Sequence, residues 1–342
     1  MTANAAARRA DRLLGFYVDK SRDLPWRSPP GGAGLDPYRV WLSEIMLQQT
    51  TVATVVPRFA RFVERWPTLA ALAGASDEEV LGEWAGLGYY ARARNLIACA
   101  RQVAAAGGFP RTAAELRKLP GLGAYTSAAI AAIAFAEDVA PIDTNVSRVI
   151  ARLHAIANPA ADQIERHFRD LAPTGRSGDV AQALMDVGAT ICRPRNPRCE
   201  DCPMVDGCLA RASGTPEMFP TPKARSERPQ RFGIAWWIER DGHVWLVRRP
   251  PRGLLGGMAA LPGANWCDEQ PEAACVMASV RHIFTHFALD LAICPAEAPM
   301  GEGWWHPLEA IGEAGLPTLY RRAVSQVLEA RAASNPLRLD PA

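Results

Sequence analysis

The chain has 342 residues, of which 49% are hydrophobic, and its formal net charge at pH 7 is +2. This length favours two domains, and the hydrophobic content is ample for packed cores. The first 20 residues combine charged side chains with no long apolar run, which excludes a signal peptide and a membrane span there and predicts a cytoplasmic protein. Because the net charge is small, binding to nucleic acid must depend on local basic clusters.

The N-terminal part of the chain predicts three helices. Residues 8–20 and 51–66 place hydrophobic side chains on one face, whereas residues 38–47 are hydrophobic throughout their centre. Between the first two predicted helices lie Leu24-Pro25-Trp26-Arg27 and a loop rich in Pro and Gly. The chain therefore begins with a mostly α-helical domain.

Glu44 lies in the centre of the second predicted helix, among hydrophobic neighbours. Loss of solvation there would raise its pKa and let it hold a proton at neutral pH, as a general acid must. The alternative is that the helix turns Glu44 toward water, or that Glu44 forms an ion pair with Arg39 or Arg58. Periodicity alone does not separate the two.

Two further segments are candidates for contact with bases. Gln48-Gln49-Thr50 ends the second predicted helix, and its flat amides either are solvated or fill a gap in a DNA stack. Residues 86–94 form a glycine-loosened turn that carries Leu87, tyrosines including Tyr89, and arginines. Tyrosine stacks on bases and arginine meets phosphates, although tyrosine pairs are as often found in ordinary packing.

Residues 115–136 predict a helix, a tight turn and a second helix that starts near Tyr125. Pro120, Gly121 and Gly123 break what would otherwise be one helix. Glycine has no Cβ, so backbone N–H groups at the positive end of the second helix are open to a phosphate. Such a helix-hairpin-helix holds nucleic acid without reading bases.

Asp143 follows a proline-containing turn and precedes a helix with Val146, Val149 and Ile150 on one face. Aspartate is a favoured N-cap, so capping is one interpretation. The other is catalytic, because the hairpin upstream would hold a nucleotide against this carboxylate.

Four of the eight cysteines, Cys192, Cys199, Cys202 and Cys208, fall in one loop after predicted helices at 162–172 and 178–190. Disulfides are not expected in a reducing compartment, so the loop predicts a metal site. One close pair flanked by two singles differs from common zinc patterns, and four cysteines along a compact loop can bind an iron-sulfur cluster. The remaining cysteines show no ligand spacing.

Residues 212–230 have the composition of a linker, so we expect a first domain over 1–211 and a second over 231–342. Short strand patterns follow. Residues 232–239 and 244–248 around Asp241-Gly242 predict a β-hairpin, and further strands precede a helix near 318–332. The second domain is therefore predicted to be α+β.

Taken in order, these segments resemble the MutY-type adenine DNA glycosylases, helix-hairpin-helix enzymes of base excision repair. The motifs that carry the resemblance are residues 24–27, 40–50 and 86–90, the hairpin, Asp143 and the cysteine loop at 192–208. Residues 252–263 resemble the Nudix-like domain at the end of these proteins. The resemblance implies a helical glycosylase domain with an iron-sulfur loop, one 4Fe-4S cluster, and a Nudix-like C-terminal domain.

The implied reaction is hydrolysis of the N-glycosidic bond of adenine opposite 8-oxoguanine or guanine in double-stranded DNA. In this comparison Glu44 protonates adenine N7 and Asp143 stabilises the sugar cation. Asn145 orients Asp143 or water, and Tyr125 hydrogen-bonds to Asp143 or shields the cation. The residues implied in contacts with DNA are Trp26, Arg27, Gln48, Gln49, Thr50, Leu87, Tyr89, Gly121, Gly123, Gln182, Thr285 and His286.

Tyr125 also implies that the enzyme is monofunctional. Relatives that cut the strand carry a lysine two residues after the second glycine, whose amine attacks the sugar. A phenol at this position cannot form an imine. The expected product is an abasic site in an intact strand.

The chain departs from the family pattern in two places, because Thr144 stands where glycine is usual and Thr285 where serine is usual. After Gly263 it also lacks the run of glutamates with which a true Nudix hydrolase holds magnesium. The alternatives weighed are an iron-sulfur electron carrier, a Nudix hydrolase, and a thymine-mismatch or endonuclease III-like glycosylase. The last two lack the C-terminal domain. We expect a monomer without membrane contact.

Overall fold

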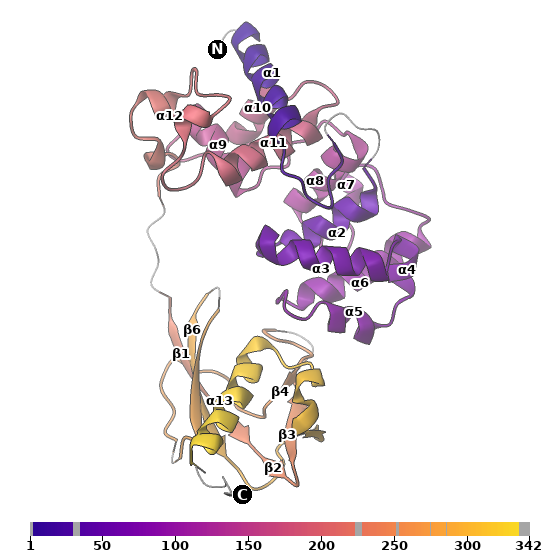
Figure 1. Cartoon of the computed structure of the whole chain (residues 1–342), viewed down its shortest axis with the longest axis vertical. Helices are drawn as coiled ribbons and strands as arrows, with labels where there is room; N and C mark the ends of the chain where they lie inside the picture. Colours follow the sequence, from indigo (N-terminus) through magenta and orange to yellow (C-terminus); the bar gives the residue numbers. More distant parts are fainter. Residues whose placement is uncertain are drawn as a thin grey trace, which may run out of the picture. The chain divides into compact units, whose positions relative to one another are not determined.

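The computed structural model describes residues 3–29, 35–222, 228–250, 253–273, 275–284 and 286–334. The chain divides into two compact units, Met1–Glu83 with Arg92–Ala224, and Trp84–Ala91 with Arg225–Ala342. Figure 1 shows the helices of the first unit and the mixed strands and helices of the second. The predicted fold class, a helical glycosylase domain followed by an α+β Nudix-like domain, is confirmed.

Helices make up the N-terminal part of the chain. Their bounds are α1 (Ala3–Lys20), α2 (Pro37–Leu47), α3 (Val52–Arg65), α4 (Leu69–Gly74), α5 (Asp77–Glu83), α6 (Ala91–Ala105), α7 (Ala113–Leu116), α8 (Ala124–Phe135), α9 (Thr144–Leu153), α10 (Ala161–Leu171), α11 (Ser177–Thr190), α12 (Leu209–Ala212) and the 3-10 turns η1 (Cys199–Asp201) and η2 (Pro216–Met218). The helices predicted before residue 190 are therefore confirmed, with small shifts at their ends.

Local sequence explains where α2 and α3 begin. Asp36 caps α2 by accepting a hydrogen bond from the Tyr38 N–H at 2.9 Å, and Pro37 supplies the fixed φ that suits a first helical residue. Thr51 caps α3. Helix α3 buries Val55 and Phe59 on the face predicted from spacing, whereas α2 is buried almost all round.

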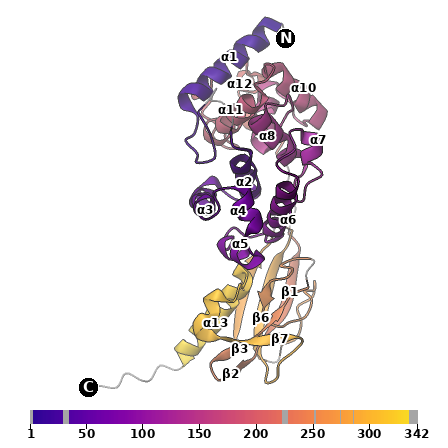
Figure 2. The same cartoon turned by 90° about the vertical axis from the view of Figure 1, so that its right-hand side faces the viewer.

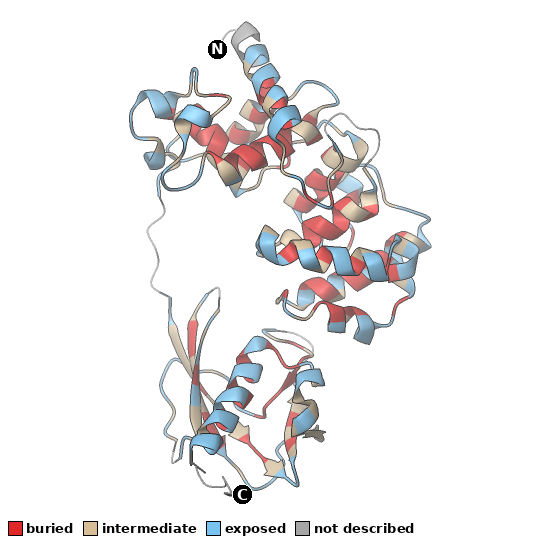
Figure 3. Cartoon of the chain, in the orientation of Figure 1, coloured by how far each residue is buried: buried red, intermediate tan, exposed pale blue. Residues whose placement is uncertain are grey.

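Two groups of helices position the later site. Helices α1, α9, α10 and α11 share one hydrophobic core, against which Cys192, Cys202 and Cys208 also pack. Helix α2 packs on α3 and α8, and α11 contacts α1, α8 and α9. Figure 3 shows the buried faces of α2, α8, α9 and α11 in red. Helix α11 thus joins the two groups, because it packs on α9 and on α8, which in turn packs on α2.

The C-terminal unit contains two small sheets. Its elements are β1 (Gln230–Trp237), β2 (Glu239–Arg240), β3 (His243–Arg248), β4 (Ala259–Ala260), β5 (Ala278–Ile283), β6 (Ala288–Pro295), β7 (Gly303–Pro307), η3 (Leu308–Glu313) and α13 (Thr318–Ser334). One sheet has the order β1-β6-β5, with β1 parallel and β5 antiparallel to β6. In the other, β3 pairs antiparallel with β2, β4 and β7.

Side chains from both sheets and α13 form one core, which includes Trp237, Leu246, Leu291 and Val324. Figure 2 shows α13 beside the strands of this unit.

The β-hairpin predicted from residues 232–239 and 244–248 is confirmed at its turn and wrong along most of its first strand. Around Asp241-Gly242, Glu239 and Arg240 pair antiparallel with Val244 and His243, and the Trp245 N–H donates to the Ile238 carbonyl at 2.8 Å. Strand β1 instead lies parallel to β6, with Gln230 opposite Ala288 and Trp237 opposite Pro295. The turn signal is local, but the partner of β1 lies far along the chain, where spacing of turn residues gives no guide.

Candidate active site and cysteine loop

A cleft of about 1940 Å³ opens in the helical unit. Its lining includes both predicted catalytic carboxylates, Glu44 and Asp143. Seven other predicted site residues also line it, namely Trp26, Arg27, Gln48, Thr50, Tyr125, Asn145 and Gln182. Helices α2, α8, α9 and α11 contribute these side chains together with the segment before α2. The structure therefore brings together residues that are more than a hundred positions apart.

Glu44 is buried in the wall of this cleft, with 8% of its surface exposed. The pKa of Glu44 is raised from 4.5 to about 7, and the largest cause is burial. A hydrogen bond from Tyr125 lowers this pKa, the charge of Asp143 raises it and the charge of Arg27 lowers it. The interpretation in which α2 turns Glu44 toward water is wrong. Arg39 donates to the Pro25 carbonyl at 3.1 Å, and the cation that acts on Glu44 is Arg27.

Tyr125 begins the second helix of the hairpin, and its hydrogen-bond partner is Glu44 rather than Asp143. The reason lies in the packing of α8 on α2, which carries Glu44. Burial raises the pKa of Tyr125 well above its ordinary value, and the charges of Glu44 and Asp143 raise it further. The phenol therefore keeps its proton and donates a hydrogen bond to the Glu44 carboxyl group.

Asp143 caps helix α9 and also faces the cleft, so both interpretations of this residue hold geometrically. Its Oδ1 accepts from the Val146 N–H at 2.6 Å, and its Oδ2 accepts from Asn145 Nδ2 at 2.9 Å. Gly188 leaves room for Asn145, because a Cβ at position 188 would lie 2.6 Å from the Asn145 Cβ. Two donors therefore fix the orientation of this carboxylate.

Arg148 continues this network toward the cysteine loop. Its Nη2 donates to Asn145 Oδ1 and to the Gly188 carbonyl, both at 2.8 Å, and its Nε donates to the Cys192 carbonyl at 2.9 Å. Arg148 is not among the site residues predicted from the sequence. Its only signal was a position one turn beyond Asn145 on α9.

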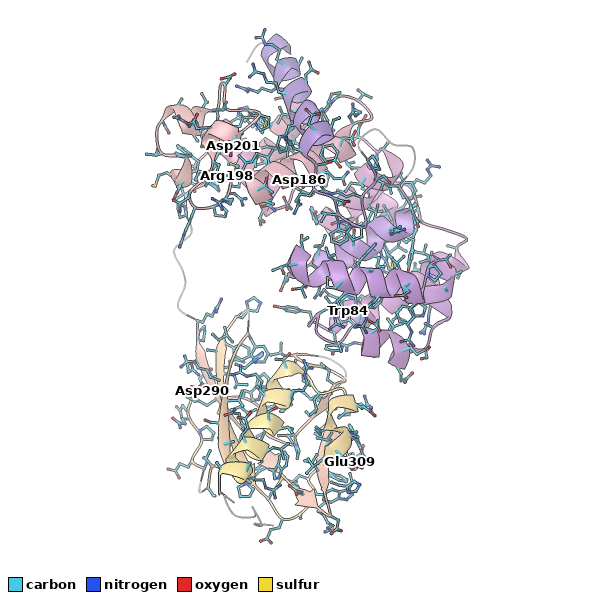
Figure 4. The ribbon with its side chains drawn as sticks, in the orientation of Figure 1. Trp84, Asp186, Arg198, Asp201, Asp290 and Glu309 are labelled. Carbon is cyan, nitrogen blue, oxygen red and sulfur yellow. The ribbon has the colours of Figure 1, made fainter. Side chains whose placement is uncertain are left out.

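Asp186 on α11 holds the segment that carries Trp26 and Arg27. Only 1% of this aspartate is exposed, and it accepts from Arg22 Nε at 2.5 Å, from the Arg22 N–H at 3.0 Å and from Arg27 Nη1 at 2.6 Å. Figure 4 labels Asp186 within the helical unit. Trp26 is buried edge-on against Phe59, with ring centroids 5.3 Å apart. Asp186 therefore positions Arg27 near Glu44, a role that the sequence did not reveal.

The polar residues near α2 and on α11 differ in exposure. Gln182 is buried, with Nε2 3.4 Å from the Gly178 carbonyl, and Gln48 Nε2 donates to Thr126 Oγ1 at 3.2 Å. Gln49 is exposed and adopts a positive φ of 57°. Thr50 donates from Oγ1 to the Gln48 carbonyl at 3.3 Å. Of these side chains, Gln49 is thus the one that points to solvent.

Leu87 and Tyr89 belong to the segment Trp84–Ala91, which falls in the second compact unit. Leu87 is buried, whereas Tyr89 is 50% exposed with a φ of 48°. An exposed aromatic ring on a left-handed backbone position matches the predicted glycine-loosened turn.

The hairpin turn joins α7 to α8, which pack against each other. Gly121 has a φ of 77°, and a Cβ there would lie 2.8 Å from the Asn95 Cβ, so this position requires glycine. Gly123 caps α8 with a φ of −82° and has open space where a Cβ would be. An incoming group can therefore approach the backbone N–H groups at the start of α8.

Cys192, Cys199, Cys202 and Cys208 line one small pocket in the loop before α12. All four are free thiols, and burial raises the pKa of Cys199, Cys202 and Cys208, which neighbouring thiols raise further. Within the described residues, no three potential ligands converge on a single ion. Four cysteine thiols around one pocket are a ligand set that an iron-sulfur cluster takes, so these residues fit that group.

The arginines of this loop are partly neutralised. Arg198 lies 3.5 Å from Asp201, and Arg211 pairs with Glu200 at 2.6 Å. Figure 4 labels Arg198 and Asp201. Arg195 is exposed. The net positive charge of this loop is therefore smaller than the count of its arginines indicates.

Two of the residues implied in contacts with DNA, Thr285 and His286, fall between β5 and β6 in the sequence. Thr285 lies outside the described residues, and His286 is exposed. Around the turn between these strands the Phe284 N–H donates to the Phe287 carbonyl at 2.9 Å, and Trp266 stacks on Phe284 with centroids 5.3 Å apart. The turn is thus closed by a backbone bond and supported by an aromatic ring.

Comparison with known proteins agrees with this geometry. Residues 42–174 match the HhH-GPD superfamily of base excision DNA repair proteins, residues 192–208 match the iron-sulfur binding domain of endonuclease III, and residues 233–326 match the NUDIX domain. The solved structure of a thermostable thymine-DNA glycosylase is similar over 60% of this chain and 97% of its own, with 30% identity and a TM-score of 0.54. Hairpin, cleft and cysteine loop together define a DNA glycosylase of base excision repair that carries an iron-sulfur binding loop.

Sequence relatives narrow this class. The chain is 34% identical to the adenine DNA glycosylase of Mus musculus, covering 85% of this chain and 72% of the mouse protein. It is 29% identical to the adenine DNA glycosylase of Buchnera aphidicola, covering 93% of this chain and 95% of that protein. The chain belongs to the adenine DNA glycosylase family. None of its described helices has the length and apolar character needed to cross a membrane.

Proposed function

We propose that this protein removes adenine from mispairs with 8-oxoguanine or guanine in double-stranded DNA and leaves an abasic site in an uncut strand. The observation that carries this proposal is the pair of carboxyl groups in one cleft. Glu44 has a pKa raised to about 7, and Asp143 is held by two N–H donors. One group can give a proton while the other keeps its charge.

The target adenine is out of reach within the duplex and must be flipped into the cleft. Glu44 in its acid form gives its proton to adenine N7, which makes the base a neutral leaving group when the C1′–N9 bond breaks. Asp143 stabilises the positive charge that develops on the sugar, either electrostatically or through a transient bond. Water then adds at C1′, and its proton returns to a carboxylate.

The remaining cleft residues bind and orient. Trp26, Arg27 and Gln182 line the space for the base, and Asn145 aims Asp143. By the family resemblance, Gln49 and Tyr89 enter the duplex beside the lesion, with Gln48, Thr50 and Leu87 near them. Gly121 and Gly123 open the backbone of the hairpin to a phosphate, which holds the strand without regard to sequence.

Tyr125 supports the monofunctional product. It stands at the position of the lysine in strand-cutting relatives and donates to Glu44 instead of attacking the sugar. Product strands should break only after alkali treatment, and borohydride should trap little covalent adduct. Efficient cleavage without alkali, with an adduct trapped at a comparable rate, would contradict a hydrolytic mechanism.

Cys192, Cys199, Cys202 and Cys208 would hold one 4Fe-4S cluster, which when bound supplies a cross-link for the loop and a redox centre. The chain's own thiols provide all four ligands. Iron and sulfide analysis of the purified protein tests this assignment, and zinc in place of iron would refute it.

A glycosylase assay on three duplexes tests the substrate. Single-turnover rates should be highest for 8-oxoguanine:A, lower for G:A and negligible for G:T. Preferential excision of thymine from G:T would favour the alternative of a thymine-mismatch glycosylase.

The double substitution Thr285→Ala with His286→Ala tests the reading of 8-oxoguanine. A good base contact contributes on the order of 1 to 3 kcal/mol, so the gap between 8-oxoguanine:A and G:A should narrow. Arg321→Ala, which changes an exposed residue of α13, is the control. An unchanged ratio of rates and affinities would assign this turn to the fold alone.

The proposal includes a monomer that works in the cytoplasm on chromosomal DNA. Its support is the cleft, which lies within one chain and contains both carboxylates. Light scattering of the protein with and without a duplex measures the oligomeric state.

A further inference from the structure

Arg152 is a buried arginine on α9 whose side chain the proposed chemistry does not use. It is 3% exposed. Its Nη1 lies 2.6 Å from the Arg193 carbonyl, 3.3 Å from the Cys192 carbonyl and 3.4 Å from Cys192 Sγ. Its Nη2 donates to the Pro194 carbonyl and its Nε to the Phe219 carbonyl, both at 2.9 Å. One guanidinium therefore joins α9, the start of the cysteine loop and the chain beyond that loop.

The contact with Cys192 Sγ differs from the others, because that sulfur is a proposed cluster ligand. The main-chain carbonyl of Arg152 also accepts from Cys208 Sγ at 3.5 Å, so residue 152 meets both ends of the ligand set.

Two other arginines of the loop are arranged differently. Arg198 and Arg211 extend into solvent and pair with acidic residues of the same loop. Their charges are screened by water and balanced by their partners. The charge of Arg152 acts from the buried side, where screening is weak.

We propose that Arg152 is a positioning residue for Cys192, which it holds as a cluster ligand, and that it raises the reduction potential of the cluster bound there. The inference rests on the proposed 4Fe-4S cofactor. An N–H donor on a thiolate sulfur withdraws negative charge, and a nearby cation favours the state with the extra electron. The bond from Arg152 Nε to the Phe219 carbonyl also ties the guanidinium to the chain beyond the loop.

Protein-film voltammetry of the iron-loaded full chain without DNA tests the proposal. Arg152→Met keeps much of the apolar stem and removes the donors and the charge, so the midpoint should shift to a more negative potential. Arg152→Lys keeps the charge but loses the fork of donors and should shift the midpoint less. Arg195→Met removes an exposed charge from the same loop and should leave the midpoint near that of the wild type. Iron content and the rate of iron loss to a chelator report on ligand holding.

Each outcome decides a different point. Wild-type protein without iron would refute the proposed cofactor itself. Iron-loaded Arg152→Met with an unchanged midpoint and an unchanged rate of iron loss would overturn the role of Arg152 alone. If Arg152→Met keeps its helical circular dichroism but loses iron, while Arg152→Lys binds iron at a lower midpoint, the holding role is supported. Loss of helical signal in both variants would overturn the proposal, because Arg152 would then serve the fold as a whole.

Discussion

The two carboxyl groups of the cleft occupy opposite kinds of position. Glu44 lies in the middle of α2, where the backbone groups are already paired within the helix and burial raises its pKa to about 7. Asp143 lies at the start of α9, where unpaired N–H groups and Asn145 donate to it. Hydrogen bonds to the charged form stabilise a carboxylate, whereas burial favours the acid, and at Glu44 burial outweighs the hydrogen bond from Tyr125. Position along a helix thus fits the proposed roles of Glu44 as proton donor and Asp143 as anion.

Because the two carboxyl groups differ in environment, we expect adenine excision to need the proton of Glu44 and the negative charge of Asp143. Glu44→Gln and Asp143→Asn should each slow adenine excision by on the order of 100-fold to 10,000-fold, because one loses the proton and the other the charge. Asparagine caps a helix about as well as aspartate, so Asp143→Asn should leave α9 in place. Single-turnover excision rates and duplex affinities measure the effect.

Glu83→Gln is the matched control, since Glu83 is also buried but pairs with Arg61 at 2.7 Å outside the cleft. Its excision rate should stay close to that of the wild type. Near-normal excision by Glu44→Gln or Asp143→Asn would remove the basis for the two roles.

The two carboxyl groups could be found from the sequence, whereas the residues that support them could not. The hydrophobic run around Glu44 and the turn before Asp143 are local patterns, and the cysteine spacing predicted the loop. The supports of the site are not local. Asp186 contacts Arg22 and Arg27 across about 160 positions of the chain, and no spacing rule marks an aspartate on α11 as buried. For the same reason the parallel pairing of β1 with β6 could not be predicted.

Asn145→Ala should remove one of the two hydrogen bonds that orient Asp143 while leaving its carboxylate in place. A hydrogen bond to a charged group contributes about 1.5 to 3 kcal/mol, so excision should slow by roughly 10-fold to 100-fold. Asn158→Ala, an exposed asparagine in the lining of the same cleft, is the control and should change little. Equal rates for the two variants would show that Asp143 is held well enough by the Val146 N–H.

The protonation of Glu44 should control how the excision rate depends on pH. Because its pKa is about 7 rather than 4.5, the acid form dominates below pH 7 and disappears above it. Excision under single-turnover conditions should therefore fall by about tenfold per pH unit above about pH 7. A rate that stays flat to pH 9 would be incompatible with Glu44 as the proton donor.

The same pKa shift also makes the free energy of unfolding depend on pH. Between pH 4.5 and about 7 the folded protein holds a proton on Glu44 that the unfolded chain has released, so raising the pH across this range lowers the free energy of unfolding. Glu44→Gln removes this contribution. Denaturant unfolding at several pH values should show a flatter pH dependence for the variant than for the wild type.

Tyr125→Phe gives the smallest effect and separates the two influences on Glu44. The hydrogen bond from Tyr125 lowers the pKa of Glu44 against the larger effect of burial, so its removal should move the falling limb of the pH–rate profile to higher pH. The rate at pH 7 should change only a few-fold, because the acid form becomes more populated while one contact to the carboxyl group is lost. Tyr38→Phe, which removes a buried hydroxyl bonded to the Trp66 carbonyl at 2.7 Å, should leave the limb in place. A limb that moves to lower pH in Tyr125→Phe would mean that the hydroxyl stabilises the acid form. In that case Tyr125, rather than burial, would explain why Glu44 keeps its proton.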